Sequence, residues 1–146
     1  MLYVLSLALW MKRRDAGARL AWTAGCALYL AHVAAAFALR HHWSHAAAYQ
    51  ETARQTREVF GIDSGAGIYF NYAFTILWIA DALWWWLAGL DRYRTRPRRV
   101  TVAVHLFFAF MFFNGAIVFG SPFMRWLGTA AILILLVVAA SRLPPK

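Results

Sequence analysis

Long runs of apolar residues, separated by short polar segments, dominate the pattern along the chain. Four of these runs come close to the length of about 20 residues that a membrane-crossing helix needs, and a shorter run stands at the N-terminus. The predicted spans are residues 1–11 (short or partial), 20–39, 68–90, 100–120 and 124–140. The pattern therefore predicts an all-α fold, a polytopic transmembrane helical bundle of four or five spans, which forms one domain over residues 1–146.

The segment 41–66, between the second and third runs, is polar but is not simply a loop. Residues 45–60 contain neither proline nor glycine. Three- and four-residue spacing would place four of these residues on one face of a helix: Tyr49, Ala53, Thr56 and Phe60. We therefore expect an amphipathic helix that lies on the membrane or covers one end of the bundle.

The charged residues predict an orientation. The net charge of +9 is concentrated in two short segments, residues 12–19 and 91–99. Basic loops between apolar runs are typical of the cytoplasmic side. These segments and the C-terminus are expected to be cytoplasmic, and the nearly neutral segment 40–67 extracytoplasmic. The high alanine and arginine content favours a bacterial inner (cytoplasmic) membrane. Nucleic acid is not an expected partner, because no folded basic surface is left to bind it.

Composition also favours a lipid environment. The chain is 62% hydrophobic and 14% charged, whereas soluble domains are about 25% charged.

Trp22, near the inner end of its span, is expected at the membrane interface. The sole cysteine, Cys26, cannot form an intramolecular disulfide. Ala27, Ala31 and Ala35 repeat at four-residue spacing, which lets a neighbouring helix of another subunit or a second copy approach closely.

Ionisable residues within the predicted spans are the first candidate site. They form an expected intramembrane polar cluster of Asp81, His32, His105 and Asn114. Asp81 should lie near the middle of the membrane, where a carboxylate must be neutral or paired. Helix depth allows His32 or His105 as its partner. The pair could relay protons or cations, or could simply hold two helices together. The buried face of this helix is predicted to carry Phe74, Trp78, Asp81 and Trp85.

The second candidate site is a histidine cluster, His41, His42 and His45. If the preceding helix continued past residue 39, His41 and His45 would lie one turn apart and could share a copper or zinc ion. Haem between His32 and His105 is not expected, because their depths differ by about 10 Å in this register.

The sequence contains no phosphate-binding loop, nucleophile elbow, zinc-protease motif or cysteine pair, so no catalytic residue is predicted and an enzyme is disfavoured. The leading hypothesis is an accessory or structural subunit of a membrane complex. One alternative is a small proton- or cation-coupled transporter or channel that uses Asp81. Another is a copper- or zinc-binding, or redox, membrane component that uses the outer histidines.

Overall fold

The computed structural model describes residues 2–141 and confirms the all-α class, since these residues contain helices and short turns but no strand. The helices, in chain order, are α1 (Leu2–Met11), α2 (Asp15–Leu39), α3 (His45–Phe60), α4 (Gly67–Leu87), α5 (Gly89–Arg94), α6 (Arg98–Phe113), the π-helix η1 (Asn114–Val118) and α7 (Pro122–Ala140).

Within the described residues, three helices are long and apolar enough to cross a membrane. They are α2, α6 continued by η1, and α7. The ten-residue α1 is too short for this. The 21 residues of α4 are enough in length, but Asn71, Asp81 and several near-neutral tryptophans and tyrosines lower its hydropathy. The span count of four or five therefore stays a prediction beyond these three helices.

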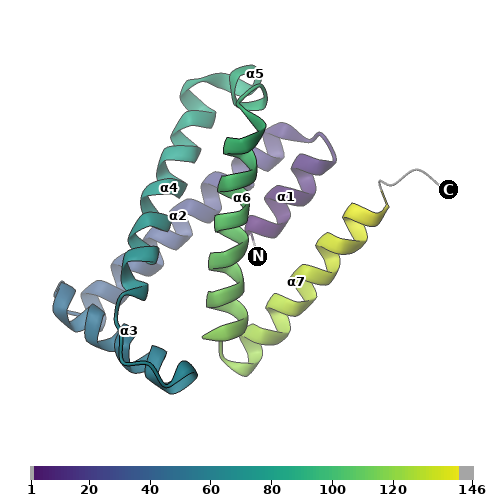
Figure 1. Ribbon diagram of the computed structural model, residues 1–146. Coiled ribbons are helices and arrows are strands. Elements are labelled where there is room, and N and C mark those ends of the chain that lie inside the picture. Colours follow the sequence, from purple (N-terminus) through teal and green to yellow (C-terminus); the bar gives the residue numbers. More distant parts are fainter. Residues whose placement is uncertain (1, 142–146) are drawn as a thin grey trace.

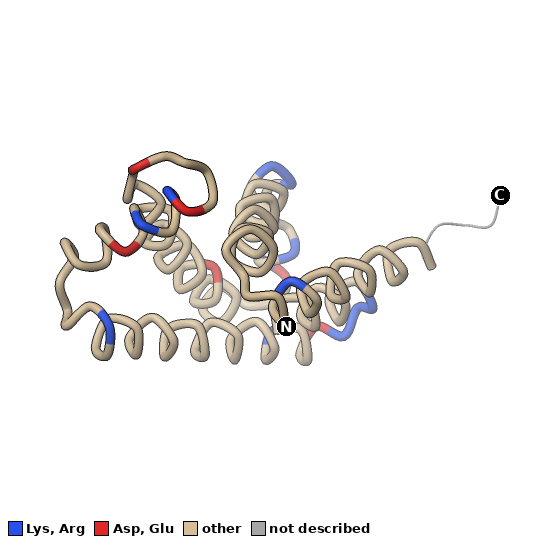
Figure 2. Tube along the Cα trace, turned by 90° about the horizontal axis from the view of Figure 1, so that it is seen from below, with Lys and Arg blue, Asp and Glu red and all other residues tan. Residues whose placement is uncertain are grey.

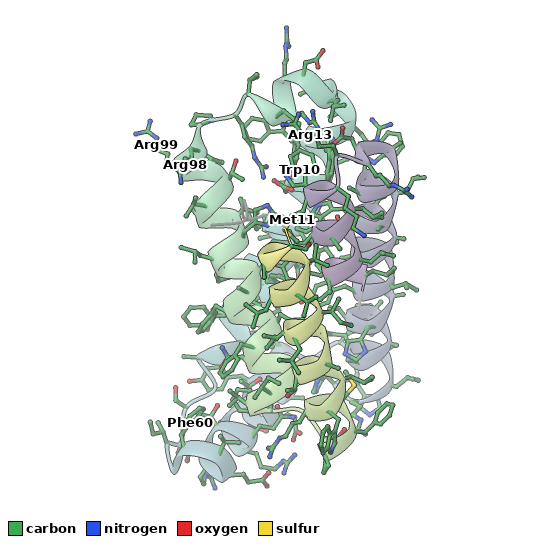
Figure 3. All side chains as sticks on the ribbon, turned by 90° about the vertical axis from the view of Figure 1, so that its right-hand side faces the viewer. Trp10, Met11, Arg13, Phe60, Arg98 and Arg99 are labelled. Carbon is green, nitrogen blue, oxygen red and sulfur yellow. The ribbon has the colours of Figure 1, made fainter. Side chains whose placement is uncertain are left out.

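The chain runs back and forth, so that its turns gather at two ends (Figure 1). The α1–α2 turn and the α4–α5–α6 connection lie at one end, here called the basic end, which carries residues 12–14 and 92–99. Helix α3 and the α6–α7 turn lie at the other, here called the α3 end. Figure 3 accordingly places Arg13, Arg98 and Arg99 far from Phe60. At the basic end, Arg94 Nη2 lies 2.5 Å from Asp15 Oδ1, an ion pair that joins the two basic segments.

Local signals in the sequence determine where several helices begin and end. Ser44 precedes α3, and its side chain accepts a hydrogen bond from the Ala47 amide at 3.2 Å. Gly61 ends α3 with a φ of +72°, a conformation that glycine adopts without strain. The helix predicted over residues 45–60 is therefore present, and its side of the membrane remains a prediction. Ser121 caps the start of α7 as Ser44 caps α3, and Pro122 is the first residue of α7.

The core is mainly aromatic and lies between α1, α2, α4 and α6. Trp22 and Phe108 are its largest fully buried side chains, and their rings stack with centroids 4.7 Å apart. Trp22 was expected at the membrane interface; its ring is enclosed within the bundle, at 2% exposure, because α1 packs along α2 and covers it. Gly25 allows this close packing, since a Cβ there would lie 3.0 Å from the Trp78 ring. The predicted buried face of α4 is confirmed, with exposures between 2% and 8% for Phe74, Trp78, Asp81 and Trp85.

Of the three helices long and apolar enough to cross a membrane, α7 is the least buried, and its C-terminal end diverges from α6 (Figure 1). Its buried residues are Gly128 and Ala131. A Cβ at Gly128 would lie 2.9 Å from both Ala116 Cβ and Ile117 Cδ1, so glycine is what lets α7 approach η1. Viewed from below, α2 and α7 are uncharged over most of their length (Figure 2).

Candidate functional site

A buried ion pair lies toward the basic end of the bundle. Asp81 belongs to α4, and Arg96 belongs to the turn that precedes α6. The side chains of Asp81 and Arg96 are 3% and 2% exposed, and Arg96 Nη1 donates a hydrogen bond to Asp81 Oδ1. The Tyr93 hydroxyl donates to Asp81 Oδ2 at 2.7 Å. Both carboxylate oxygens therefore have a donor, as a buried carboxylate requires.

Further contacts hold this Asp81 network, defined as Asp81, Tyr93, Arg96 and Thr101. Arg96 Nε donates to Thr101 Oγ1 at 2.9 Å, and the guanidinium carbon lies 4.1 Å from the centre of the Tyr93 ring. Burial, followed by the nearby carboxylate of Asp81, raises the pKa of the Tyr93 phenol. The phenol consequently keeps its proton at neutral pH and remains a donor to Asp81.

Aromatic rings close the network off from its surroundings. The rings of Trp85 and Tyr93 stack with centroids 4.3 Å apart and an angle of 4° between their planes. Trp10 of α1 meets both rings edge-on, at 5.0 Å and 5.6 Å. The cavity beside them has a volume of only about 10 Å³, about the space that one water molecule needs.

The four predicted polar residues do not form one hydrogen-bonded cluster, although His105 lines the same small cavity as Tyr93. Asp81 hydrogen-bonds to Arg96 and Tyr93 rather than to either histidine. Depth along the helices suggested a histidine partner, whereas α5 and the following turn fold back over the end of α4 and bring Tyr93 and Arg96 to Asp81. His105 lies edge-on to Trp22, with ring centroids 6.1 Å apart, and its buried Nδ1 has no hydrogen-bond partner among the described residues. His32 and Asn114 lie elsewhere, at the α3 end.

The condition for the histidine metal site is not met. Helix α2 ends at Leu39, and both His42 and Trp43 have positive φ, so His41 and His45 do not share a helix face. His45 Nδ1 is hydrogen-bonded to the Tyr72 hydroxyl at 2.8 Å. Within residues 2–141, no three histidine, cysteine, aspartate or glutamate side chains are placed to hold a metal ion.

Three neighbouring cavities lie between the middle of the bundle and the α3 end, and all three are lined by Asn71. The largest, of about 490 Å³, is apolar and is called here the apolar cavity. It is lined mainly by aromatic and methionine side chains, which include Tyr3, Phe74, Trp78, Phe108, Met111, Phe112 and Met124.

The other two are called here the polar cavities and lie beneath α3, with volumes of about 270 Å³ and 370 Å³. Both are lined by His32 of α2, Asn71 of α4, and Thr52 and Gln55 of α3. No lysine or arginine is among the described residues that line any of the three cavities. A helix that covers one end of the bundle was one of the two expectations for residues 45–60, but no cavity beneath it was predicted. The polar residues of α3 at positions 52, 55 and 56 were the available signal.

No protein-family model matches the chain, and no curated protein or solved structure matches it. The function is therefore inferred from the geometry of the chain itself.

Proposed function

We propose that the protein is an integral membrane protein that serves as an accessory subunit of a membrane complex. In this proposal α2, α4, the continuous α6–η1 segment and α7 cross the membrane. The basic end lies in the cytoplasm and α3 lies outside. Helix α1 accompanies α2 as a short or partial span.

The Asp81 network is the observation that carries this proposal. A carboxylate that moves protons or cations needs a free oxygen and a path for water or ions. Asp81 instead has both oxygens occupied, and aromatic rings surround it. Its role in the proposal is to fasten the turn before α6 onto α4, which gives the bundle a fixed shape for assembly.

The outward surface of the bundle supports an assembling role. Ala27, Ala31 and Ala35 of α2 are exposed, so the close helix approach that they permit is not used within the chain. Helix α7 likewise leaves large apolar side chains such as Trp126 and Val137 exposed, at 78% and 68%. In a membrane these surfaces contact lipid or a neighbouring subunit.

A labelling experiment tests the orientation. Cys26 is replaced by alanine, and single cysteines are introduced by Thr95→Cys at the basic end or Ser64→Cys at the α3 end. A membrane-impermeant maleimide added to intact spheroplasts should label the Ser64→Cys protein. The Thr95→Cys protein should react only in inside-out vesicles. The reverse pattern would overturn the proposed orientation.

A second experiment tests the accessory role. The tagged chain is extracted from its native membrane in mild detergent and should elute with other membrane subunits at a fixed stoichiometry. Ala31→Leu should weaken this assembly, whereas Ala109→Leu on the exposed side of α6 should not. A chain that elutes alone or only with copies of itself would contradict the proposal.

Proteoliposomes distinguish the accessory subunit from the transporter alternative. If the chain is an accessory subunit with Asp81 enclosed, vesicles that contain the purified chain should acidify under a proton gradient no faster than empty vesicles. Proton movement that is lost in Asp81→Asn, while the protein still folds, would favour the transporter over the accessory subunit.

A further inference from the structure

We propose that the apolar cavity and the two polar cavities together form a binding site for a single-chain lipid with an uncharged, hydrogen-bonding headgroup. In this site the chain lies in the apolar cavity and the headgroup lies beneath α3. This goes beyond the accessory role, because it assigns the bundle a specific ligand.

The apolar cavity has the size and lining that a lipid chain needs. Its volume of about 490 Å³ falls within the range of about 300–1,000 Å³ typical of small-molecule sites. The Phe74 and Phe108 rings, with centroids 4.6 Å apart, form part of its inner wall. It is formed by residues from α1, α2, α4, α6, η1 and α7, so a chain bound there would lie between helices and not only along the outer surface.

The polar cavities determine the kind of headgroup. They offer imidazole, hydroxyl and amide groups but no lysine or arginine among the described lining residues. Phosphate and carboxylate groups are normally bound by arginine or lysine. The one carboxylate in the lining, Glu51, is already paired with Arg54 at 2.6 Å, which lowers the pKa of Glu51 to about 2. This lining therefore suits hydroxyl or carbonyl oxygens rather than an anion.

Several polar groups along these cavities lack a partner. Neither the Asn71 side-chain amide nor the His32 imidazole is hydrogen-bonded to another described residue. The indole N–H of Trp78, a residue only 6% exposed, is likewise unpartnered and belongs to the lining of the apolar cavity. A buried donor without a partner is costly, and this applies to the Trp78 N–H. Asn71 and His32 are exposed side chains, so their polar groups are open to a ligand. A ligand with neutral oxygens would supply acceptors to the Asn71 amide.

The roof over the headgroup position is held close to the bundle. A Cβ at Gly65 would lie 2.3 Å from the Tyr49 carbonyl oxygen, so the segment before α4 is in tight contact with α3. The His45–Tyr72 hydrogen bond joins the first residue of α3 to α4, one turn before Tyr49. The N-terminal end of α3 is thus fixed to the bundle beside the polar cavities, which gives the headgroup a defined position.

One glycine allows a direct test. Gly115 lines both the apolar cavity and the larger polar cavity, and a Cβ added there meets nothing within 4 Å. Gly115→Phe should therefore obstruct the junction of these cavities while leaving the fold intact. Ala109→Phe is the matched control, because it adds the same ring to an exposed position of α6 outside the cavity linings.

The probe is 1-oleoylglycerol with a diazirine in its acyl chain, added to the full chain in detergent and activated by light. Adducts should be found by peptide mass spectrometry on cavity residues such as Phe108, Met111 and Met124. Unlabelled 1-oleoylglycerol should compete, whereas its phosphate, 1-oleoyl lysophosphatidic acid, should not. Gly115→Phe should reduce labelling to background, and Ala109→Phe should label like the wild type.

A second variant tests the headgroup contact. Asn71→Leu removes an amide with no described hydrogen bond and should weaken competition by unlabelled 1-oleoylglycerol about threefold to tenfold, the value of one hydrogen bond. Equal labelling of Gly115→Phe and Ala109→Phe would show adventitious lipid only, and equal competition by the phosphate would exclude a neutral headgroup. Either result overturns the proposal. If Gly115→Phe does not elute as a folded protein, the Asn71→Leu shift alone decides, and an unchanged affinity refutes the site.

Discussion

Removal of Arg96 from the Asp81 network should strongly destabilise the protein. Arg96→Met retains the length of the side chain but leaves a carboxylate that is 3% exposed with the Tyr93 hydroxyl as its remaining donor. Breaking a buried ion pair by removing one partner costs about 3–5 kcal/mol. The lost hydrogen bond to Thr101 and the lost contact with the Tyr93 ring add to this cost. We expect Arg96→Met to lose about 3–5 kcal/mol in the free energy of unfolding.

The double variant Asp81→Leu/Arg96→Met provides the decisive comparison. Replacing both partners with apolar side chains removes the unpaired charge, so most of the stability should return. Unfolding can be followed by titrating dodecyl maltoside micelles with SDS and recording tryptophan fluorescence, because Trp22 and Trp85 are buried in the core. If the double variant is as unstable as the sum of the single variants, the two side chains are not coupled and the reasoning about the network fails. A wild-type unfolding curve for Arg96→Met would refute it equally.

Three further predictions concern the same fold. Tyr93→Phe removes one hydrogen bond to a charged group and should lower the free energy of unfolding by about 1.5–3 kcal/mol in the same titration. Gly128→Leu should cost about 1–3 kcal/mol through overpacking against η1, and increased protease cleavage near α7 would report it. The pKa of Glu51 is depressed in the folded state, so the stability that its pair with Arg54 contributes is present above the unfolded pKa of about 4.3 and is lost as the pH falls toward about 2. Lowering the pH from about 5 to about 2.5 should therefore reduce the melting temperature of the wild type more than that of Glu51→Gln.

Each of these predictions has an outcome that contradicts it. Wild-type stability of Tyr93→Phe would mean that its hydroxyl contributes nothing to the network. Gly115→Leu is the control for Gly128→Leu, since its position is open, and equal losses from both would show that close approach of α7 is not the cause. An acid-induced change of equal size in Glu51→Gln would assign that change to other groups.

The amino-acid sequence by itself determined the longer helices, because their signals are local; α5, within the segment predicted as a basic loop, was not predicted. Apolar runs, the Ser44 cap, Gly61 and the Ser121–Pro122 pair each act within a few residues, and the helix over residues 45–60 follows from them. The pattern of three- and four-residue spacing also identified the buried face of α4 correctly. The alternation of apolar runs and basic loops was also enough to predict that the two basic segments lie at the same end of the bundle.

The tertiary structure alone decided which polar groups meet. Asp81 could be recognised from the sequence as a residue that needs a partner, but Arg96 was one of five arginines in a predicted surface loop. Arg96 rather than another of these arginines pairs with Asp81 because of the way α5 folds back over α4. The cavities depend on side chains from α1, α2, α3, α4, α6, η1 and α7, far apart in the chain. Their position is set by glycines such as Gly25 and Gly128, which control how closely helices approach. Contacts of this kind arise from the packing of several helices at once, so no local pattern of residues encodes them.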